Sequence, residues 1–404
     1  MSRQPFLPII VGTDINAYNM AISFHEEYKI RPILVGKGVL PFTNLSTIPR
    51  VIEYDKKLGD PSQFAKILIS VAKKYEAEAE KLVLVGTNDL YVRLIIENRD
   101  ILKDYFVFNY IEEDLMNNLQ IKSNFYKLCA EYDIDIPTTI FYDCKTDGDF
   151  EEEMMYPVII KPSNGIEYSR HPFEGQAKVF KVESKEEVQK VINMIKNSGY
   201  QDILIIQDYI PGDDTAMWDS VVYVNSKGKT QLVSFAQVVL QEHTKTAIGN
   251  YTALITRFNE EVMTKLRGFL EAVGYRGYGN FDLKYDERDG KFKVFEVNIR
   301  QGRSSYYINA MGSNLARNFA DDSIYNRSKE CEYLKGDVLF SVVPKIVLKN
   351  FVNDAAVKKD IVRLIREKKM VNPLFYKQDK HLKRKFYMFI RQVNYYKKYK
   401  QNVW

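Results

Sequence analysis

FEVNIRQGRSS, residues 295–305, ends an apolar run with two arginines, a glycine and two serines. A strand that only completes a hydrophobic core needs none of these side chains. Glu296 and Asn298 are two residues apart, so an extended strand presents both of them on the same face. That face is therefore either solvated or holds something that takes two oxygen ligands.

The segment 279–298, GNFDLKYDERDGKFKVFEVN, predicts a β-hairpin because two alternating stretches flank turn-forming residues at 286–290. Pairing the two strands brings Asp282 near Glu296 and Asn298. Two carboxylates and an amide carbonyl are hard ligands that suit Mg²⁺, which keeps open positions for phosphate oxygens. The alternative is a solvated face with incidental acids, and the spacing alone leaves both interpretations open.

Composition indicates a globular enzyme with reduced thiols. The 404 residues allow two or three domains, and 27% charged residues are ordinary for a globular chain. The three cysteines form no C-x-x-C pair, which favours a cytoplasmic location. The four histidines are scattered, so a histidine-based metal site or triad has little support. No apolar run approaches the roughly 18–20 residues of a transmembrane segment.

The C-terminal residues 377–404 carry nine basic residues and one acidic residue, although the whole chain has a net charge of only +5. Aromatic residues are interleaved with these charges. Such a segment suits a membrane surface, a nucleic acid or a large anionic substrate. We favour the simpler interpretation, an amphipathic helix that packs its aromatic side chains on the body, and we expect no nucleic-acid partner.

Residues 1–118 alternate short apolar strands with helical stretches, which predicts a parallel α/β sheet of the Rossmann-like type. The expected helices include 61–80 and 90–102. The first turn lacks the G-x-G-x-x-G fingerprint of a dinucleotide site. Polar residues at 14–16 and 87–89 follow strand ends, where open α/β sheets bind ligands, although turns alone also explain them.

The pattern changes after residue 118. A helix is expected at 123–132, and strands are expected around 134–141, 156–161, 177–182 and 204–210. We divide the chain into an N-terminal domain (1–118), two central subdomains (119–205 and 206–325, the second with the metal site) and a C-terminal helical basic segment (326–404).

Three motifs in this order resemble the ATP-grasp ligases: PVIIKPSNG (157–165), IIQDYIPGDD (205–214) and the hairpin that ends in FEVNIRQG. The opening PIIVGTDINAYNMAISFHEEY (8–28) and EVNIRQGRSSYY (296–307) narrow the resemblance to the D-aspartate ligases of peptidoglycan cross-bridge synthesis. The resemblance covers residues 6–325. It implies an α/β ATP-grasp fold behind an N-terminal pre-ATP-grasp domain.

The resemblance also implies an ATP site. Lys122 and Lys161 correspond to the phosphate-binding lysines, although surface lysines that extend along apolar neighbours would look the same. Asp214 lies where the family places an acid on the ribose, and a turn aspartate is the competing explanation. A flexible cover over the phosphates is expected at Ser163 and Gly165. The expected adenine-binding hinge, which reads the base with main-chain groups, comprises Gln207, Asp208, Tyr209 and Ile210.

The family's metal ligands correspond to Asp282, Glu296 and Asn298, which would hold two Mg²⁺ ions. The related D-alanine–D-alanine ligases use a backbone N–H at the position of Gly302 toward the tetrahedral oxyanion. Those ligases carry an arginine where this chain has Asn280. Arg300 and Arg303 are the candidates for the missing positive charge, with a salt bridge as the alternative for either.

The implied reaction joins the β-carboxyl of D-aspartate to the lysine side chain of a nucleotide-linked peptidoglycan precursor. ATP activates the carboxylate as an acyl phosphate, and ADP and phosphate are released. Three alternatives stay open: a ligase for another amino acid or carboxylate, a kinase that stops at phosphoryl transfer, and a nucleotide-binding module without turnover. The sequence also leaves a homodimer open.

Overall fold

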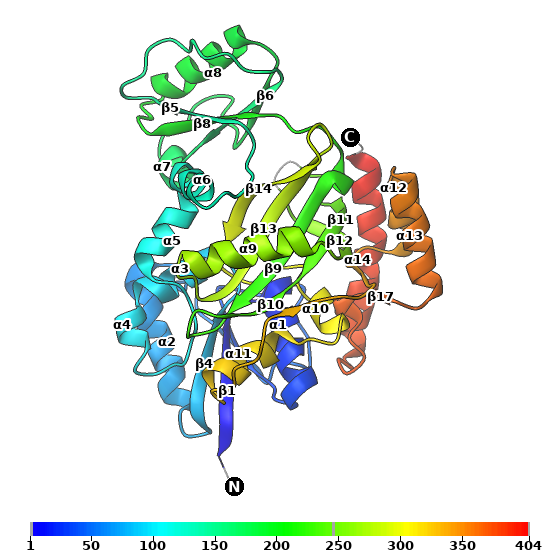
Figure 1. Ribbon diagram of the computed structural model, residues 1–404. Coiled ribbons are helices and arrows are strands. Elements are labelled where there is room, and N and C mark those ends of the chain that lie inside the picture. The colour runs from blue at the N-terminus through cyan, green and yellow to red at the C-terminus, as the bar shows by residue number, and fades with distance from the viewer. Residues whose placement is uncertain (1–2, 245–246, 403–404) are drawn as a thin grey trace.

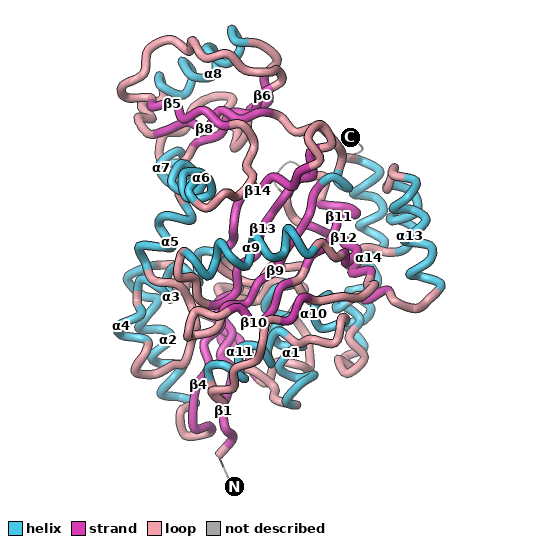
Figure 2. The backbone as a smooth tube through the Cα atoms, viewed as in Figure 1, coloured by secondary structure: helices cyan, strands magenta, loops and turns pink. Residues whose placement is uncertain are grey.

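A computed structural model describes residues 3–244 and 247–402. Its strands form three sheets, each with its own helices (Figures 1 and 2). The N-terminal sheet and the largest sheet share two hydrophobic cores. The other four-stranded sheet, β5-β8-β6-β7, has the fewest residues in its strands and is called the smallest sheet; it has a core of its own. The smallest sheet stands apart at the top of Figure 1.

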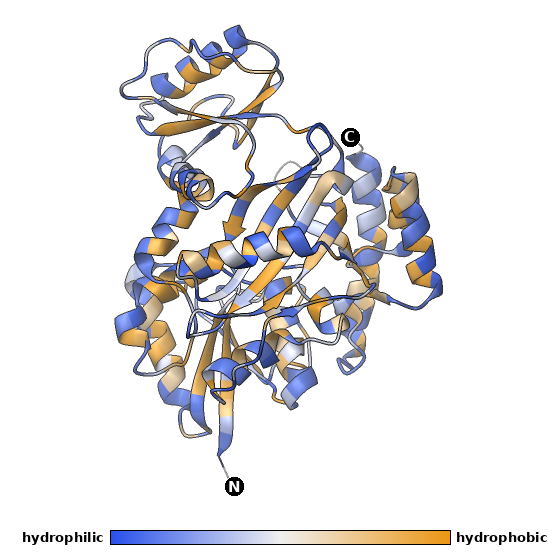
Figure 3. Cartoon of the chain, in the orientation of Figure 1, coloured by the Kyte–Doolittle hydropathy of each residue, from blue (hydrophilic) through white to orange (hydrophobic). Residues whose placement is uncertain are grey.

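The N-terminal sheet is parallel, as the sequence predicts, and its strands run in the order β3-β2-β1-β4. Alternate residues of β1 enter different cores: Phe6 and Ile10 join the core with the first helix, and Ile9 joins the core with the second. Figure 3 shows β1, beyond its hydrophilic start, and β4 as largely apolar ribbons. The elements are β1 (Gln4–Val11), α1 (Ile15–Tyr28), β2 (Ile33–Gly36), β3 (Val51–Tyr54), α2 (Pro61–Tyr75), β4 (Ala79–Gly86), α3 (Asp89–Glu97) and α4 (Arg99–Leu102).

Two helices of this domain differ from the prediction. The expected helix 61–80 ends at Tyr75, because the chain from Ala79 onward pairs with β1 as a strand. The expected helix 90–102 is split at Asn98, whose side-chain amide donates to the Leu94 carbonyl at 2.8 Å. Such local side-chain bonds compete with helix continuation. Strand β3 was not predicted from the sequence.

The smallest sheet is antiparallel, with the order β5-β8-β6-β7. Helix α8 supplies Val188, Ile192 and Ile195 to its core. Ser184 caps α8 by accepting from the Glu187 N–H, as the capping-box pattern predicts. The elements are α5 (Glu113–Gln120), α6 (Lys122–Glu131), β5 (Thr139–Asp143), β6 (Val158–Pro162), α7 (Gly165–Ser169), β7 (Phe180–Val182), α8 (Lys185–Asn197) and β8 (Ile203–Asp208).

The largest sheet runs in the order β14-β13-β9-β11-β12-β16-β17, with β10 and β15 paired beside β9. Helix α9 lies across one face of it (Figure 1). The elements are the 3₁₀ turn η1 (Asp214–Ala216), β9 (Met217–Val224), β10 (Thr230–Val233), β11 (Phe235–Gln241), β12 (Tyr251–Arg257), α9 (Glu260–Ala272), β13 (Gly277–Asp286), β14 (Lys291–Asn298), α10 (Tyr307–Ala310) and α11 (Leu315–Ser323).

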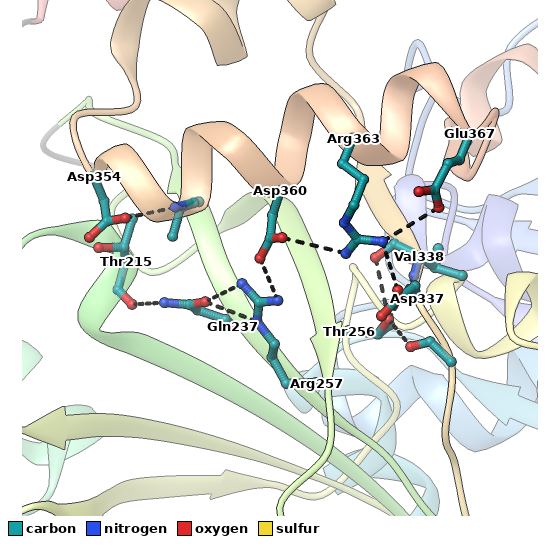
Figure 4. Close-up of polar contacts among 12 residues, drawn as sticks. Thr215, Gln237, Thr256, Arg257, Asp337, Val338, Asp354, Asp360, Arg363 and Glu367 are labelled. Carbon is teal, nitrogen blue, oxygen red and sulfur yellow. Dashed lines mark hydrogen bonds and ion pairs between the residues drawn. The ribbon is translucent and has the colours of Figure 1, made fainter.

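The C-terminal segment 326–404 is not purely helical, which corrects the prediction. It adds β15 (Glu332–Tyr333), β16 (Leu339–Ser341) and β17 (Met370–Val371) to the largest sheet. Figure 4 shows how its helix α13 (Ala355–Arg366) is fixed to that sheet: Asp360 forms an ion pair with Arg257 at 2.7 Å. The remaining elements are α12 (Lys345–Phe351), η2 (Pro373–Phe375) and α14 (Leu382–Gln401).

Helix α14 confirms only half of the expectation for the basic tail. Tyr395 and Tyr399 pack into the core, but Phe386 and Phe389 are exposed to solvent. Residues 403–404 of the tail lie outside the described residues. Within the described part of the chain, no helix is both long and apolar enough to cross a membrane.

Candidate active site

A cavity of about 320 Å³ lies where the carboxyl ends of β1 and β4 face the end of β14. The structure thus joins the polar turns of the N-terminal domain to the hairpin motif, far away in sequence. The residues that line the cavity include Asp14, Asn16, Thr87, Asn88, Asn280, Asp282, Glu296, Asn298, Arg300 and Arg303.

The predicted hairpin is present. Asp282 on β13 pairs directly with Glu296 on β14, and Asn280 pairs with Asn298. The Asn298 side-chain amide donates to the Asp282 carboxylate at 3.1 Å. The three expected metal ligands therefore lie together beside one cavity, and their binding of a metal stays a prediction.

The electrostatics of these acids fit a bound cation. Burial, followed by the charges of Glu296 and Asp219, raises the pKa of Asp282 well above its ordinary value. A divalent cation would offset that repulsion. No group of three or more His, Cys, Asp or Glu side chains suited to a metal is found among the described residues. A Mg²⁺ ion held here would complete its coordination with water and with the phosphates of a nucleotide, as Mg²⁺ prefers.

A second buried acid supports the floor of the cavity. Asp219 accepts from the Asn280 side-chain amide at 2.7 Å and from the Tyr307 hydroxyl at 2.8 Å. Burial raises the pKa of Asp219 to about 6. Asn280 in turn packs against Gly302, where an added Cβ would lie 2.3 Å from the Asn280 side-chain oxygen. The absence of a Cβ at Gly302 therefore permits the close approach of the Asn280 side chain.

The two candidate arginines differ in their surroundings. Arg300 donates to the Asp89 carboxylate at 3.0 Å and to the Asn298 side-chain oxygen at 3.2 Å. Arg303 is half-buried at the cavity wall, and its guanidinium has no hydrogen-bond or ion-pair partner within residues 3–244 and 247–402. The salt-bridge alternative therefore describes Arg300, whereas Arg303 has its donors available for a ligand.

Asp14 adds a negative group to the same wall. It caps α1 by accepting from the Ala17 N–H at 2.9 Å. Burial raises its pKa, and the charges of Arg303 and Arg300 oppose that rise. The cavity therefore offers a carboxylate and a guanidinium side by side, a pattern that suits a zwitterionic ligand.

The expected phosphate lysines lie close to each other. Lys161, on β6, donates to the Tyr126 hydroxyl at 2.7 Å and lies over the rings of Tyr126 and Phe295. Burial, with a smaller contribution from the charge of Lys122, lowers the pKa of Lys161 to about 7, while Glu296 acts in the opposite direction. A polyphosphate would restore the charge of this lysine.

Ser163 has a structural contact that the sequence did not predict. Its hydroxyl donates to the Ser123 hydroxyl at 2.9 Å, and its carbonyl accepts from the Lys122 N–H at 3.2 Å. These bonds tie the start of α6 to the end of β6 and so position Lys122. Gly165 opens the exposed helix α7, with no atom near an added Cβ. A nucleotide contact for either residue stays a prediction.

The expected hinge consists of the last two residues of β8 and the two residues that follow it. The Gln207 side chain is buried and donates to Thr139 at 2.8 Å. The Asp208 carboxylate pairs with Arg288 at 2.6 Å. Tyr209 lies beneath the ammonium groups of two lysines, and Ile210 is buried. With its side chains held by protein contacts, the hinge would read a base through its main chain, which stays a prediction.

The carboxylate of Asp214 already has protein partners. It accepts from the Gln241 N–H at 3.0 Å and side-chain amide at 2.7 Å, and its other contact is His243 at 2.9 Å. These bonds fix η1 to β11. A contact between Asp214 and a ribose stays a prediction.

Sequence reasoning missed Tyr126 and Asp219. The Tyr126 hydroxyl donates to the Phe295 carbonyl at 2.9 Å and so links Lys161 to the hairpin. Tyr126 is four residues after Lys122 on one helix, and that spacing was an available signal. Asp219 had no such signal, because an acid in an apolar strand acquires its role only from the neighbouring strand.

Comparison with known proteins decides the family. The chain is 33% identical over 414 aligned positions to a D-aspartate ligase from Enterococcus faecium, with 99% of this chain and 98% of that protein covered. The chain belongs to the D-aspartate ligase family. No protein-family model matches it.

Solved structures agree with this fold. An L-amino acid ligase from Bacillus licheniformis aligns with a TM-score of 0.56 at 15% identity, covering 80% of this chain and 75% of that one. The biotin carboxylase domain of Hydrogenobacter thermophilus 2-oxoglutarate carboxylase, in complex with MgADP, aligns with a TM-score of 0.59 at 13% identity, covering 82% and 73%. These likenesses show the ATP-grasp fold. Membership of the D-aspartate ligase family makes the chain an ATP-dependent carboxylate–amine ligase.

Proposed function

We propose that this D-aspartate ligase family member activates the β-carboxyl of D-aspartate. It would then join that carboxyl to the lysine side chain of a nucleotide-linked peptidoglycan precursor in the cytoplasm. One observation carries the choice of a dicarboxylic amino acid: Arg303 lines the same cavity as Arg300 and Asp14, and its guanidinium has no hydrogen-bond or ion-pair partner among the described residues. The 33% identity to a D-aspartate ligase supports the same substrate.

The charged groups of the cavity suit each part of D-aspartate. Arg303 would bind one carboxylate through its forked donors, a geometry that lysine lacks. Asp14, with one oxygen engaged by the Ala17 N–H, would accept from the amino group. Arg300, held by Asp89, would orient the second carboxylate toward the phosphates.

ATP would lie between the smallest sheet and the hairpin. Lys122 and Lys161 would bind its phosphates, and the hinge at the end of β8 would contact its base. Asp282, Glu296 and Asn298 would hold two Mg²⁺ ions, which supply charge neutralisation between the phosphates and the incoming carboxylate. Asn298 would present its oxygen for this purpose, which requires it to release its present contact with Arg300.

The proposed reaction has two steps. A carboxylate oxygen of D-aspartate attacks the γ-phosphorus of ATP, so an acyl phosphate forms and ADP leaves. The lysine amine then attacks the acyl carbon, and phosphate leaves with the transferred oxygen. The Gly302 backbone N–H would stabilise the tetrahedral oxyanion, and positioning with charge stabilisation supplies most of the catalysis.

A substrate panel tests this function. ADP and phosphate release are measured with D-aspartate, L-aspartate, D-alanine and D-glutamate. Each amino acid is tested with and without a UDP-linked muramyl pentapeptide that carries lysine at its third position. We expect product only with D-aspartate and the precursor together. Equal turnover with L-aspartate would reject D-aspartate as the specific substrate. An ADP release rate that is the same with and without the precursor would reject the ligation step.

A further inference from the structure

The exposed face of α14 is apolar where a solvated helix would be polar. Leu382, Phe386 and Phe389 have 80%, 63% and 60% of their surface exposed. With a helical repeat of 3.6 residues they fall within one third of the helix circumference, together with two further apolar residues. This apolar stripe consists of Leu382, Phe386, Phe389, Ile390 and Val393.

The helix that carries the apolar stripe is firmly attached through its opposite face. Arg384 is almost fully buried, pairs with Asp379 at 3.2 Å and lies over the Tyr18 ring. Gln392 donates to the Val342 carbonyl at 2.9 Å, and the Tyr399 hydroxyl donates to the Gln241 carbonyl at 2.6 Å. The apolar stripe is therefore a fixed surface of the folded protein, because α14 already packs against the body through its opposite face.

Basic residues border the apolar stripe. Helix α14 contains no acidic residue. Lys383 and Lys385 flank the apolar stripe, and Lys397 and Lys400 continue its line toward the C-terminus. None of these four has an ion-pair partner in the described part of the chain, whereas Lys398, on the side toward the body, pairs with Glu242 at 2.6 Å.

The charge pattern decides between occupants. A second copy of α14 packed on the apolar stripe would bring unpaired lysines against lysines, which is unfavourable. An anionic lipid surface instead accepts the apolar side chains into its interface and attracts the lysines to its head groups. The face of α14 is too basic to enter the hydrocarbon interior, so the helix would lie in the plane of the surface.

We infer that the apolar stripe and its four lysines form a peripheral docking site for an anionic membrane surface. The inference does not depend on which amino acid the ligase activates. Docking would place the cavity near the membrane, because the Arg384 guanidinium donates to the carbonyl of Phe42, which lines the cavity.

Co-sedimentation with vesicles tests the docking site. The full chain is mixed with vesicles of 3:1 phosphatidylcholine and phosphatidylglycerol, or of phosphatidylcholine alone, at low and high salt. We expect binding to the anionic vesicles that weakens with salt. The double variant Phe386→Ser/Phe389→Ser should lower the partition coefficient by at least about tenfold, and Lys383→Glu/Lys385→Glu by roughly tenfold.

Matched variants on distant surfaces serve as controls. Ile101→Ser/Met155→Ser removes two exposed apolar side chains, and Lys66→Glu/Lys73→Glu reverses two exposed charges on α2. Both should bind vesicles like the wild type, and all four variants should keep wild-type turnover with water-soluble substrates.

Three results would overturn the inference. The first is that the wild-type protein does not bind anionic vesicles. The second is that the stripe variants and the control variants lose vesicle binding to the same extent. The third is that the molar mass in solution falls from dimer to monomer in Phe386→Ser/Phe389→Ser. The last result would show that a second copy of the chain occupies the stripe.

Discussion

Lys161 provides the sharpest test of the proposed phosphate site. Burial and the nearby charge of Lys122 lower the pKa of Lys161 from the ordinary 10.5 to about 7. This pKa difference corresponds to a free-energy cost of at most about 5 kcal/mol for charging the buried amine, which the attraction of a bound polyphosphate could offset. Lys122 would still contact the phosphates in the variant, and water can partly reach the site. We therefore expect Lys161→Met to weaken the free energy of ATP binding by about 1.5–3 kcal/mol.

This loss corresponds to an increase of roughly 10- to 100-fold in the KM for ATP, with a lower kcat. Steady-state kinetics at varied ATP measure it, and Lys190→Met on the exposed face of α8 is the matched control. Wild-type ATP kinetics in Lys161→Met would refute the assignment of Lys161 to the phosphates.

The lowered pKa also predicts proton uptake. At about pH 8 the Lys161 amine is mostly neutral in the free protein. Phosphate binding raises its pKa, so one proton is taken up, and the uptake disappears below about pH 6, where the free amine is already protonated. Calorimetry of ATP binding in buffers of different ionisation enthalpy should show this uptake in the wild type and not in Lys161→Met. Equal proton exchange in the two proteins would contradict the reasoning.

The other predictions concern the cavity. Arg303→Lys keeps the charge but loses the fork, so it should raise the KM for the amino acid about tenfold or more and leave the KM for ATP nearly unchanged; equal KM values would place Arg303 outside the substrate site. Glu296→Gln should lower kcat by several orders of magnitude without unfolding the protein, and full turnover with unchanged Mg²⁺ dependence would exclude the metal site. Gly302→Ala forces a Cβ against Asn280, so thermal unfolding should show a loss of about 1–3 kcal/mol; Gly268→Ala on α9, which meets no atom within 4 Å, should be neutral or stabilising, and equal stability of the two variants would disprove the packing argument.

The hairpin and the parallel sheet were predictable because their signals are local. Alternation with a period of two predicts that Glu296 and Asn298 share a face. The register beside the turn alone would place Asp282 opposite Phe295, and a register shift between Asp282 and Leu283 places it opposite Glu296. The N-terminal strands are apolar on both faces, which indicates helices on both sides of the sheet.

Contacts between distant segments were not predictable. Arg300 meets Asp89 across more than two hundred residues, and no local pattern encodes the docking of β4 beside the hairpin. Asp219 gains its role only because β9 lies next to β13. The apolar stripe of α14 was misjudged for a similar reason: a helical period shows that two faces differ, but not which face meets the body.

Transfer of a carboxyl oxygen to phosphate tests the central claim most directly. D-aspartate labelled with ¹⁸O in both carboxyl groups is incubated with ATP, Mg²⁺ and the lysine-containing precursor, and the released phosphate is analysed by mass spectrometry. Activation as an acyl phosphate predicts one ¹⁸O atom in each phosphate, released together with ADP and a β-linked amide. Unlabelled phosphate, or release of AMP and pyrophosphate, would contradict the account.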